Sequence, residues 1–131
     1  MSTESISDYI SEKTLLGSIG ENQRHIKTLL KTKANTIKKV QSAMDDKART
    51  KTPLNDRQQR VFHEFMGVYA KEGGRLQESL MRAENIQNYL HTESTQPFIL
   101  SLMLLQKHQC IAINSLRHMI ASGQETLNDL C

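Results

Sequence analysis

Residues 61–80 read VFHEFMGVYAKEGGRLQESL, and their apolar side chains recur at alternating steps of four and three. The series runs through Phe62, Met66, Tyr69, Gly73, Leu76, Leu80, Ala83, Gln87 and Leu90. Its phase is unchanged across Gly73 and Gly74, although two adjacent glycines cost about 1–2 kcal/mol relative to alanines inside a helix. We therefore expect one long helix over 53–91, with another helix approaching closely at Gly73 to offset that cost.

The segment before it has the same spacing. Its seam follows Leu16, Ile19, Gln23, Ile26, Leu30, Lys33, Ile37, Val40 and Met44. This pattern predicts a basic helix over 21–50 with heptad spacing. Gly17 and Gly20 indicate a break, so residues 1–20 are expected to form a separate short helix or leader. Thr52 followed by Pro53 is a favourable start for the next helix.

A third helix is expected over 97–122, capped by Ser94 or Thr95 and with Pro97 in its first turn. Its first half, from residue 98 to residue 105, is apolar nearly all round. Gly123 is expected to stop it, which leaves 123–131 as a tail. The sequence thus predicts a single all-α domain, a bundle of three long helices plus a short N-terminal helix with coiled-coil-like packing.

The composition supports this class. Hydrophobic residues make up 37% of the 131 residues and aromatic residues only 5%, which fits neither a disordered chain nor a β-sandwich. The N-terminus has no secretory signal pattern, and the apolar run at 98–105 is too short to cross a bilayer. Cys110 and Cys131 have no ligand or redox spacing. We expect a cytoplasmic protein without a transmembrane segment.

Catalytic and metal-binding patterns are missing from the sequence. The five histidines are preceded three residues earlier by Asn22, Arg60, Asn88, Leu105 and Ser115. None of these is a carboxylate, whereas di-iron bundles use a Glu-x-x-His pair. The sequence also has no nucleophile elbow and no phosphate-binding loop. We therefore expect no enzyme activity, no metal and no cofactor.

One alternative starts from His63, which is followed by Gly67 and, six residues later, by Gly73. This spacing resembles that of histidine phosphotransfer domains, in which a His-x-x-Lys-Gly run on a bundle helix is followed by a further glycine. The resemblance covers about a dozen residues. It implies that His63 is a phosphoacceptor and that the glycines give a partner domain room to approach. Met66 stands where that family has its lysine.

The preferred hypothesis is a non-enzymatic protein–protein interaction module: an adaptor, a chaperone-like partner or an assembly subunit. Its expected partner-binding residues lie in the apolar start of the last helix. They are Phe98, Ile99, Leu102, Met103 and Leu105. A basic patch should complement an acidic surface of the partner protein. We expect the chain to form a homodimer or a hetero-complex. It consists of Arg24, Lys27, Lys31, Lys38 and Lys39. A second alternative uses the basic segment 24–51 for nucleic acid, although no aromatic residue between 21 and 51 could stack on bases.

Overall fold

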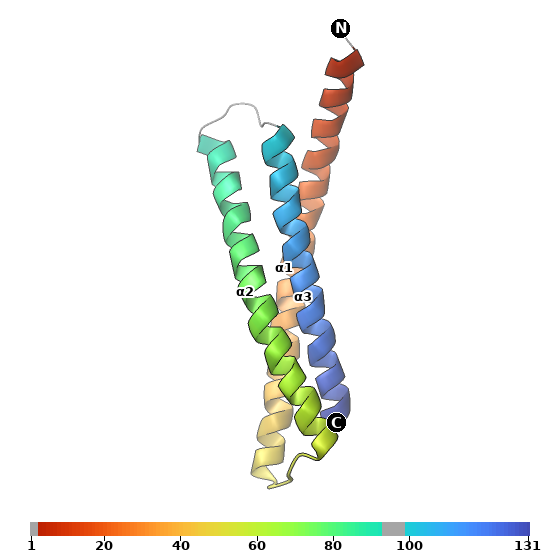
Figure 1. The fold of residues 1–131 in the computed structure, drawn as a ribbon, viewed down its shortest axis with the longest axis vertical. Helices are drawn as coiled ribbons and strands as arrows, with labels where there is room; N and C mark the ends of the chain where they lie inside the picture. The colour runs from red at the N-terminus through yellow and green to blue at the C-terminus, as the bar shows by residue number, and fades with distance from the viewer. Residues whose placement is uncertain (1–2, 93–98) are drawn as a thin grey trace.

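The computed structural model describes residues 3–92 and 99–131, and three long helices account for nearly all of them (Figure 1). These are α1 (Thr3–Arg49), α2 (Asp56–Thr92) and α3 (Ile99–Leu130). Successive helices run in opposite directions, and α1 continues beyond the end at which α2 stops and α3 starts (Figure 1). The all-α class is confirmed, and no strand occurs in either described range. Coiled-coil-like packing remains a prediction.

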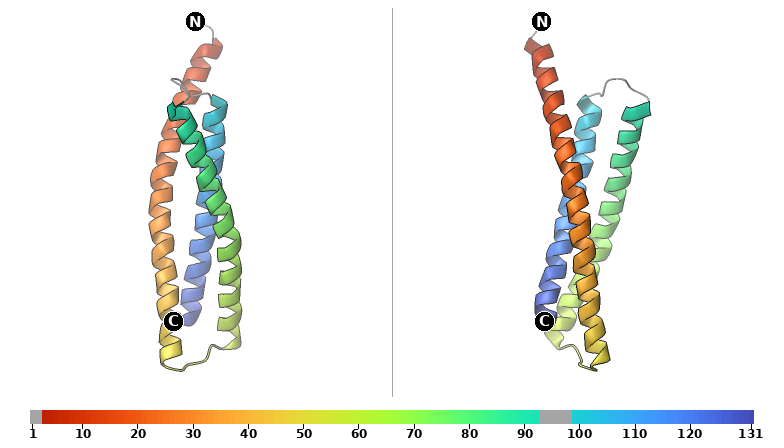
Figure 2. Two further views of the ribbon diagram at one scale, coloured as in Figure 1. Left: turned by 90° about the vertical axis from the view of Figure 1, so that its left-hand side faces the viewer. Right: turned by 180° about the vertical axis from the view of Figure 1, so that it is seen from behind.

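The helix α3 packs along both of the others, whereas the backbones of α1 and α2 stay apart throughout the described part of the chain. Figure 2 shows from two more sides how α1 crosses the other two helices obliquely. Leu102 and Leu105, exposed by only 1% and 2%, join Ile19 of α1 and Ala83 of α2 in one buried cluster. A second cluster surrounds Leu116. Because α3 has neighbours on two sides, it requires apolar residues on both. This accounts for Leu102 and Leu105 in its apolar start, but not for Leu100, Met103 and Leu104, which are exposed.

The predicted separate N-terminal helix is wrong, because α1 is continuous through Gly17 and Gly20. Leu15 and Ile19 pack into the same cluster as Leu102, so tertiary contacts hold the helix on both sides of Gly17. Each glycine costs a helix about 1 kcal/mol, which such packing can offset.

The connection between α1 and α2 is formed by two local capping motifs. Lys51 has φ 54°, and the Lys51 and Thr52 amides donate to Ala48 and Lys47 carbonyls at 3.2 and 2.9 Å. This is the hydrogen-bond pattern of a Schellman motif, in which a glycine usually takes the left-handed position. At the start of α2, the Gln58 amide donates to Asn55 Oδ1 at 2.8 Å, and the Asn55 amide donates to Gln58 Oε1 at 3.0 Å. The helix therefore starts after an Asn55 cap, three residues later than predicted from Pro53.

Gly123 does not end α3, as the sequence had suggested, but lies buried within it. A Cβ placed there would be 2.5 Å from Thr36 Cγ2 of α1 and 3.4 Å from Phe65 Cε2 of α2. The glycine is required where α3 approaches both neighbours closely. The supposed tail is the last two turns of the helix, and Leu130 at its end is buried.

The close approach predicted at Gly73 is also wrong. A Cβ built at Gly67, Gly73 or Gly74 would have no neighbouring atom within 4 Å. In its first half, α2 buries Val61 and Phe65, which lie one position before the seam residues predicted from the sequence. Phe65 lies close to Gly123 of α3. Farther along, its core face also includes Glu72, Leu76, Ser79 and Ala83. Since two of these buried residues are polar, apolar spacing alone did not identify this face.

Candidate helix-binding groove

A groove between α1 and α2 is lined mainly by apolar side chains and has a volume of about 320 Å³. From α1 it receives Ile37, Val40, Gln41, Met44 and Asp45. From α2 it receives Phe62, Phe65, Met66 and Tyr69. The predicted seams of both helices thus meet here, on a face that α3 does not cover. We call this feature the α1–α2 groove.

The floor of the groove is buried, whereas its rim is exposed. Val40 and Phe65 are 2% and 5% exposed, while Met66 and Tyr69 are 49% and 38% exposed. Along α2 the aromatic rings follow one another, with the centroid of Phe65 lying 6.4 Å from that of Phe62 and 6.1 Å from that of Tyr69. Aromatic rings and a flexible methionine can cover apolar side chains of varied shape. The groove is therefore suited to a row of apolar side chains.

Lys33 of α1 reaches across to α2, and its Nζ lies 5.8 Å from the centroid of the Tyr69 ring. This distance is within the range of cation–π attraction. The contact joins the two helices at one end of the α1–α2 groove, where their backbones do not meet.

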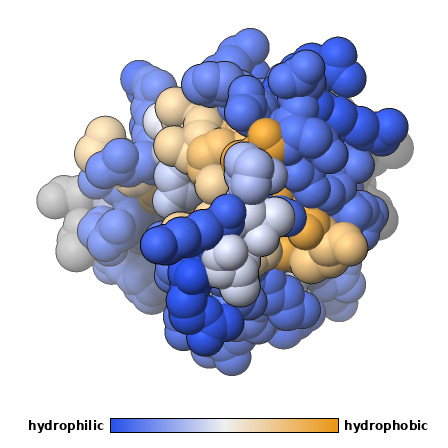
Figure 3. Space-filling model, turned by 90° about the horizontal axis from the view of Figure 1, so that it is seen from below, coloured by the Kyte–Doolittle hydropathy of each residue, from blue (hydrophilic) through white to orange (hydrophobic). Residues whose placement is uncertain are grey.

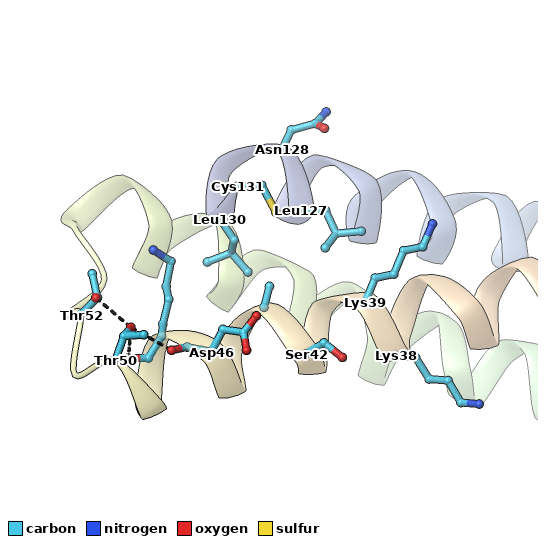
Figure 4. A pocket seen from close by; sticks show the side chains of 12 residues that line it. Lys38, Lys39, Ser42, Asp46, Thr50, Thr52, Leu127, Asn128, Leu130 and Cys131 are labelled. Atoms are coloured by element: carbon cyan, nitrogen blue, oxygen red, sulfur yellow. Dashed lines mark hydrogen bonds between the residues drawn. The ribbon is translucent and has the colours of Figure 1, made fainter.

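The predicted basic patch lies on α1, and all five of its side chains are exposed. Arg24, Lys31 and Lys38 are seven residues apart and share one face with Lys27, because seven residues make two turns of a helix. We call these four residues the basic stripe. Lys39 does not belong to it: Figure 4 shows Lys39 pointing toward α3 and Lys38 pointing away. Within the described residues, no ion pair involves the stripe.

The predicted partner-binding segment is divided between core and surface. Leu102 and Leu105 are buried against α1 and α2, so they are not available to a partner while the bundle is intact. Met103 is 51% exposed, and Ile99 is half-buried. Phe98 lies outside the described residues. Two other residues of this segment that were not singled out, Leu100 and Leu104, are also exposed.

A wider hollow of about 700 Å³ lies between the end of α1 and the end of α3 (Figure 4). Its α1 side is polar: the Thr50 hydroxyl donates to the Asp46 carbonyl at 2.8 Å and lies 2.9 Å from the Thr52 hydroxyl. Viewed from this end of the molecule, a small apolar area is surrounded by hydrophilic side chains (Figure 3). The hollow is open and has no cluster of catalytic groups.

A polar cluster at the α2–α3 interface contains a buried carboxylate. Glu72 Oε1 lies 3.5 Å from Arg75 Nη1 and 3.6 Å from His118 Nδ1, and the carboxylate accepts a hydrogen bond from Ser115. Burial by itself raises the pKa of Glu72, but the hydrogen bonds from Ser115 and His118 and the charge of Arg75 outweigh it. The pKa of Glu72 is therefore lowered. Ser115 and His118 both face the carboxylate of Glu72, and Ser115 is only 2% exposed. The Ser115 hydroxyl is therefore not arranged as a nucleophile with His118 as its base. The cluster links α2 to α3 through polar contacts.

His108 borders a shallow cleft on the same side of the bundle. Its Nδ1 is buried and has no hydrogen-bond partner among the described residues. Burial lowers the pKa of His108, and the charges of Arg82 and Lys107 lower it further, against the opposing effect of Glu78. Both effects favour the neutral form of this half-buried imidazole over the charged form.

His63, the residue of the phosphotransfer alternative, is exposed on α2 beside Asp56, Arg60 and Glu64. Asp56 and Glu64 would repel an added phosphoryl group, whereas Arg60 would attract it. Over the described ranges there is no group of three or more histidine, cysteine or acidic side chains that could hold a metal ion.

A scan against protein-family models and searches of curated proteins and of solved structures found no match to the chain. In the part of the chain that the structure describes, none of the helices combines the length and the apolar character needed to span a bilayer.

Proposed function

We propose that this chain is a non-enzymatic protein–protein interaction module whose α1–α2 groove binds an amphipathic helix of a partner protein. The observation that carries the proposal is the apolar row along the groove, which no other helix of the described chain covers. Its exposed or half-buried members are Ile37, Met44, Phe62, Met66 and Tyr69. A helix that places residues at steps of three and four into such a groove is a common mode of recognition. An adaptor, a chaperone-like partner or an assembly subunit would each use it.

The open positions at the glycines support the same proposal. Gly73 belongs to the groove-facing seam of α2, and no atom lies within 4 Å of a Cβ built there. An incoming helix could therefore approach the backbone of α2 closely at this point. Binding would also offset the cost of the glycine pair within α2.

We test this proposal with synthetic amphipathic helices of about three heptads that have a leucine seam, labelled for fluorescence anisotropy. Met66→Glu places a carboxylate in the groove and should abolish binding, because the charge would have to be buried under the peptide. Met81→Glu is the matched control, since Met81 is 56% exposed on the same helix but does not line the groove. Equal binding by both variants would refute the groove as the site.

A second copy of the chain is the alternative occupant. Light scattering over a concentration series should show a monomer at the concentrations used for peptide binding. A dimer that Met66→Glu dissociates, and Met81→Glu does not, would replace the partner helix by a second copy.

A further inference from the structure

The cleft that His108 borders lies between α2 and α3 and has a volume of about 440 Å³. Exposed charged side chains form its rim, and buried or half-buried side chains form its floor. The rim consists of Arg75, Glu78, Arg82 and Lys107, and the floor of Ser79, His108 and Ile111. No residue lines both this cleft and the α1–α2 groove, so the two features are separate. We call this feature the α2–α3 cleft.

The rim of the cleft has more positive than negative charge, with three cations and one carboxylate, Glu78. Nε and Nη2 of Arg82 both donate to Glu78 Oε1, at 3.1 and 2.9 Å. Arg75 lies 3.5 Å from Glu72, whereas Lys107 forms no ion pair within the described residues. Arg82 and Glu78 are both more than half exposed, and exposed pairs contribute little to stability. Arg82 can therefore donate to a bound anion at little cost.

The floor contains two polar groups that the fold leaves without a hydrogen bond. Ser79 is only 4% exposed, and its hydroxyl has no hydrogen-bond partner in the part of the chain that the structure describes. The same is true of the buried Nδ1 of His108. A buried polar group without a partner is destabilising, and a bound ion is one explanation for such a group. Two of them on the floor of one cleft point to a polar ligand.

From this arrangement we infer that the α2–α3 cleft binds a phosphomonoester group. Its oxygens accept hydrogen bonds from Arg82, Lys107 and the Ser79 hydroxyl. A guanidinium group can donate to two phosphate oxygens at once. A phosphomonoester has a charge of about −2 near neutral pH, which suits an excess of cations better than a single carboxylate does. A phosphorylated side chain of a protein and a small phosphorylated molecule both present this group.

The first experiment uses His108 as a reporter of binding. Burial lowers its pKa, and the charges of Arg82 on α2 and Lys107 on α3 lower it further, whereas Glu78 raises it. No described residue of α1 lines the cleft. A bound dianion offsets the two cations, so sulfate should raise the pKa of His108 in an NMR titration of the full chain. Sodium chloride at equal ionic strength is the reference, and an equal rise in chloride would overturn the proposal.

Substitutions at the rim locate the site, with phenyl phosphate as the probe. Lys107→Gln should weaken binding about fivefold, as expected for one exposed ion pair. Lys71→Gln is the matched control and should bind like the native chain, because Lys71 is an exposed lysine that does not line the cleft. Glu78→Gln should strengthen binding, since it removes the carboxylate of the rim. Equal weakening by Lys107→Gln and Lys71→Gln would contradict the cleft as the site.

Ser79→Ala separates binding from stability. It removes a buried hydroxyl without a partner and introduces a better helix former, so the midpoint temperature of the unliganded chain should rise. Binding of phenyl phosphate should nevertheless weaken about tenfold, because a hydrogen bond to a charged group is lost. Unchanged binding would overturn the site.

A phosphoserine peptide, compared with its unphosphorylated form and with phenyl phosphate, distinguishes the two sources of the group. Tighter binding than phenyl phosphate, weakened by Lys107→Gln, would assign the group to a protein, and equal or weaker binding would assign it to a small molecule. Met66→Glu should leave these affinities unchanged, so the cleft and the proposed function can fail independently. Salt-dependent binding of duplex DNA that Lys107→Gln weakens, without binding of phenyl phosphate, would overturn the phosphomonoester in favour of a polyanion.

Discussion

The substitution Gly123→Ala tests whether the tight contact of α3 with both neighbouring helices determines the stability of the bundle. The added Cβ would lie 2.5 Å from Thr36 Cγ2, about 1 Å closer than carbon atoms normally approach. Thr36 cannot easily move away, because it is only 7% exposed and its hydroxyl donates to the Thr32 carbonyl at 2.8 Å. Rotation of this side chain would move the methyl group but break that hydrogen bond.

Two effects of opposite sign determine how much Gly123→Ala changes the free energy of unfolding. Replacing a glycine by alanine inside a helix stabilises by about 1 kcal/mol. Inserting a carbon into a filled core destabilises by about 1–3 kcal/mol. We expect Gly123→Ala to lower the free energy of unfolding by about 1 kcal/mol, and the midpoint temperature by roughly 4 °C for a chain of this length.

Urea and thermal unfolding, followed by circular dichroism, measure this change. Thr36→Ser removes Cγ2 and keeps the hydroxyl, so the double variant with Gly123→Ala should be more stable than the sum of the two single effects by about 1 kcal/mol or more. A Gly123→Ala chain that is more stable than the native one, without coupling to Thr36, would refute the close-contact reasoning.

Further predictions concern other backbone positions and the buried titratable groups. Gly73→Ala and Gly74→Ala should each stabilise by about 0.5–1 kcal/mol in urea unfolding, because the added methyl groups would enter open space. A loss of stability in either variant would show that the added methyl group meets a neighbouring atom. Lys51→Gly should raise the midpoint temperature, because the φ of 54° costs a lysine about 1 kcal/mol that a glycine does not incur; a loss of stability would show that the lysine side chain contributes more. The ionised Glu72 contributes its full stabilisation above its ordinary pKa of 4.5 and loses it as the pH falls through the lower folded-state pKa. The free energy of unfolding of Glu72→Gln should therefore be lower than that of the native chain at pH 6, and the difference should become smaller toward pH 3. A margin independent of pH would contradict this. Because the pKa of His108 is lowered in the folded chain, the unfolded chain takes up the proton first as the pH falls, and the free energy of unfolding should decrease below pH 6.5. The midpoint temperature should therefore be lower at pH 5.5 than at pH 7.5, and His108→Leu should make this difference smaller. A difference that His108→Leu does not change would assign the pH dependence to another group.

The sequence predicted the elements better than their ends. Apolar spacing and the two prolines were sufficient for three long helices, because helix periodicity is a local property of the chain. The ends depended on which neighbour each residue meets. Gly17 and Gly123 both suggest the end of a helix when the sequence is considered alone. In the structure, packing of Leu15 and Ile19 against α3 keeps α1 helical through Gly17. The close approach of Thr36 explains why α3 has a glycine at position 123.

The candidate site was predictable only in part. The basic stripe could be read from its heptad spacing, because exposed charges require no partner within the fold. The apolar segment at 98–105 was assigned to a partner because sequence cannot tell an apolar side chain that faces a neighbouring helix from one that faces solvent. The polar cluster around Glu72 was missed altogether. The sequence showed only that Glu72 lies at a core-facing position of α2. Without knowing which residues of α3 face that position, this was not enough to predict the cluster.

The sequence by itself determined that this chain is helical, that each long helix needs an apolar neighbour, and that the charge on α1 is one-sided. Tertiary structure decided which seams are satisfied inside the chain. Because α3 lies between the other two helices, it buries its own apolar residues on two sides and separates the backbones of α1 and α2. The faces that these two helices turn toward each other therefore remain uncovered by α3. The periodicity of apolar residues is a local property of the sequence. Which face of each helix is buried depends on which helices pack together, and this is a property of the whole fold.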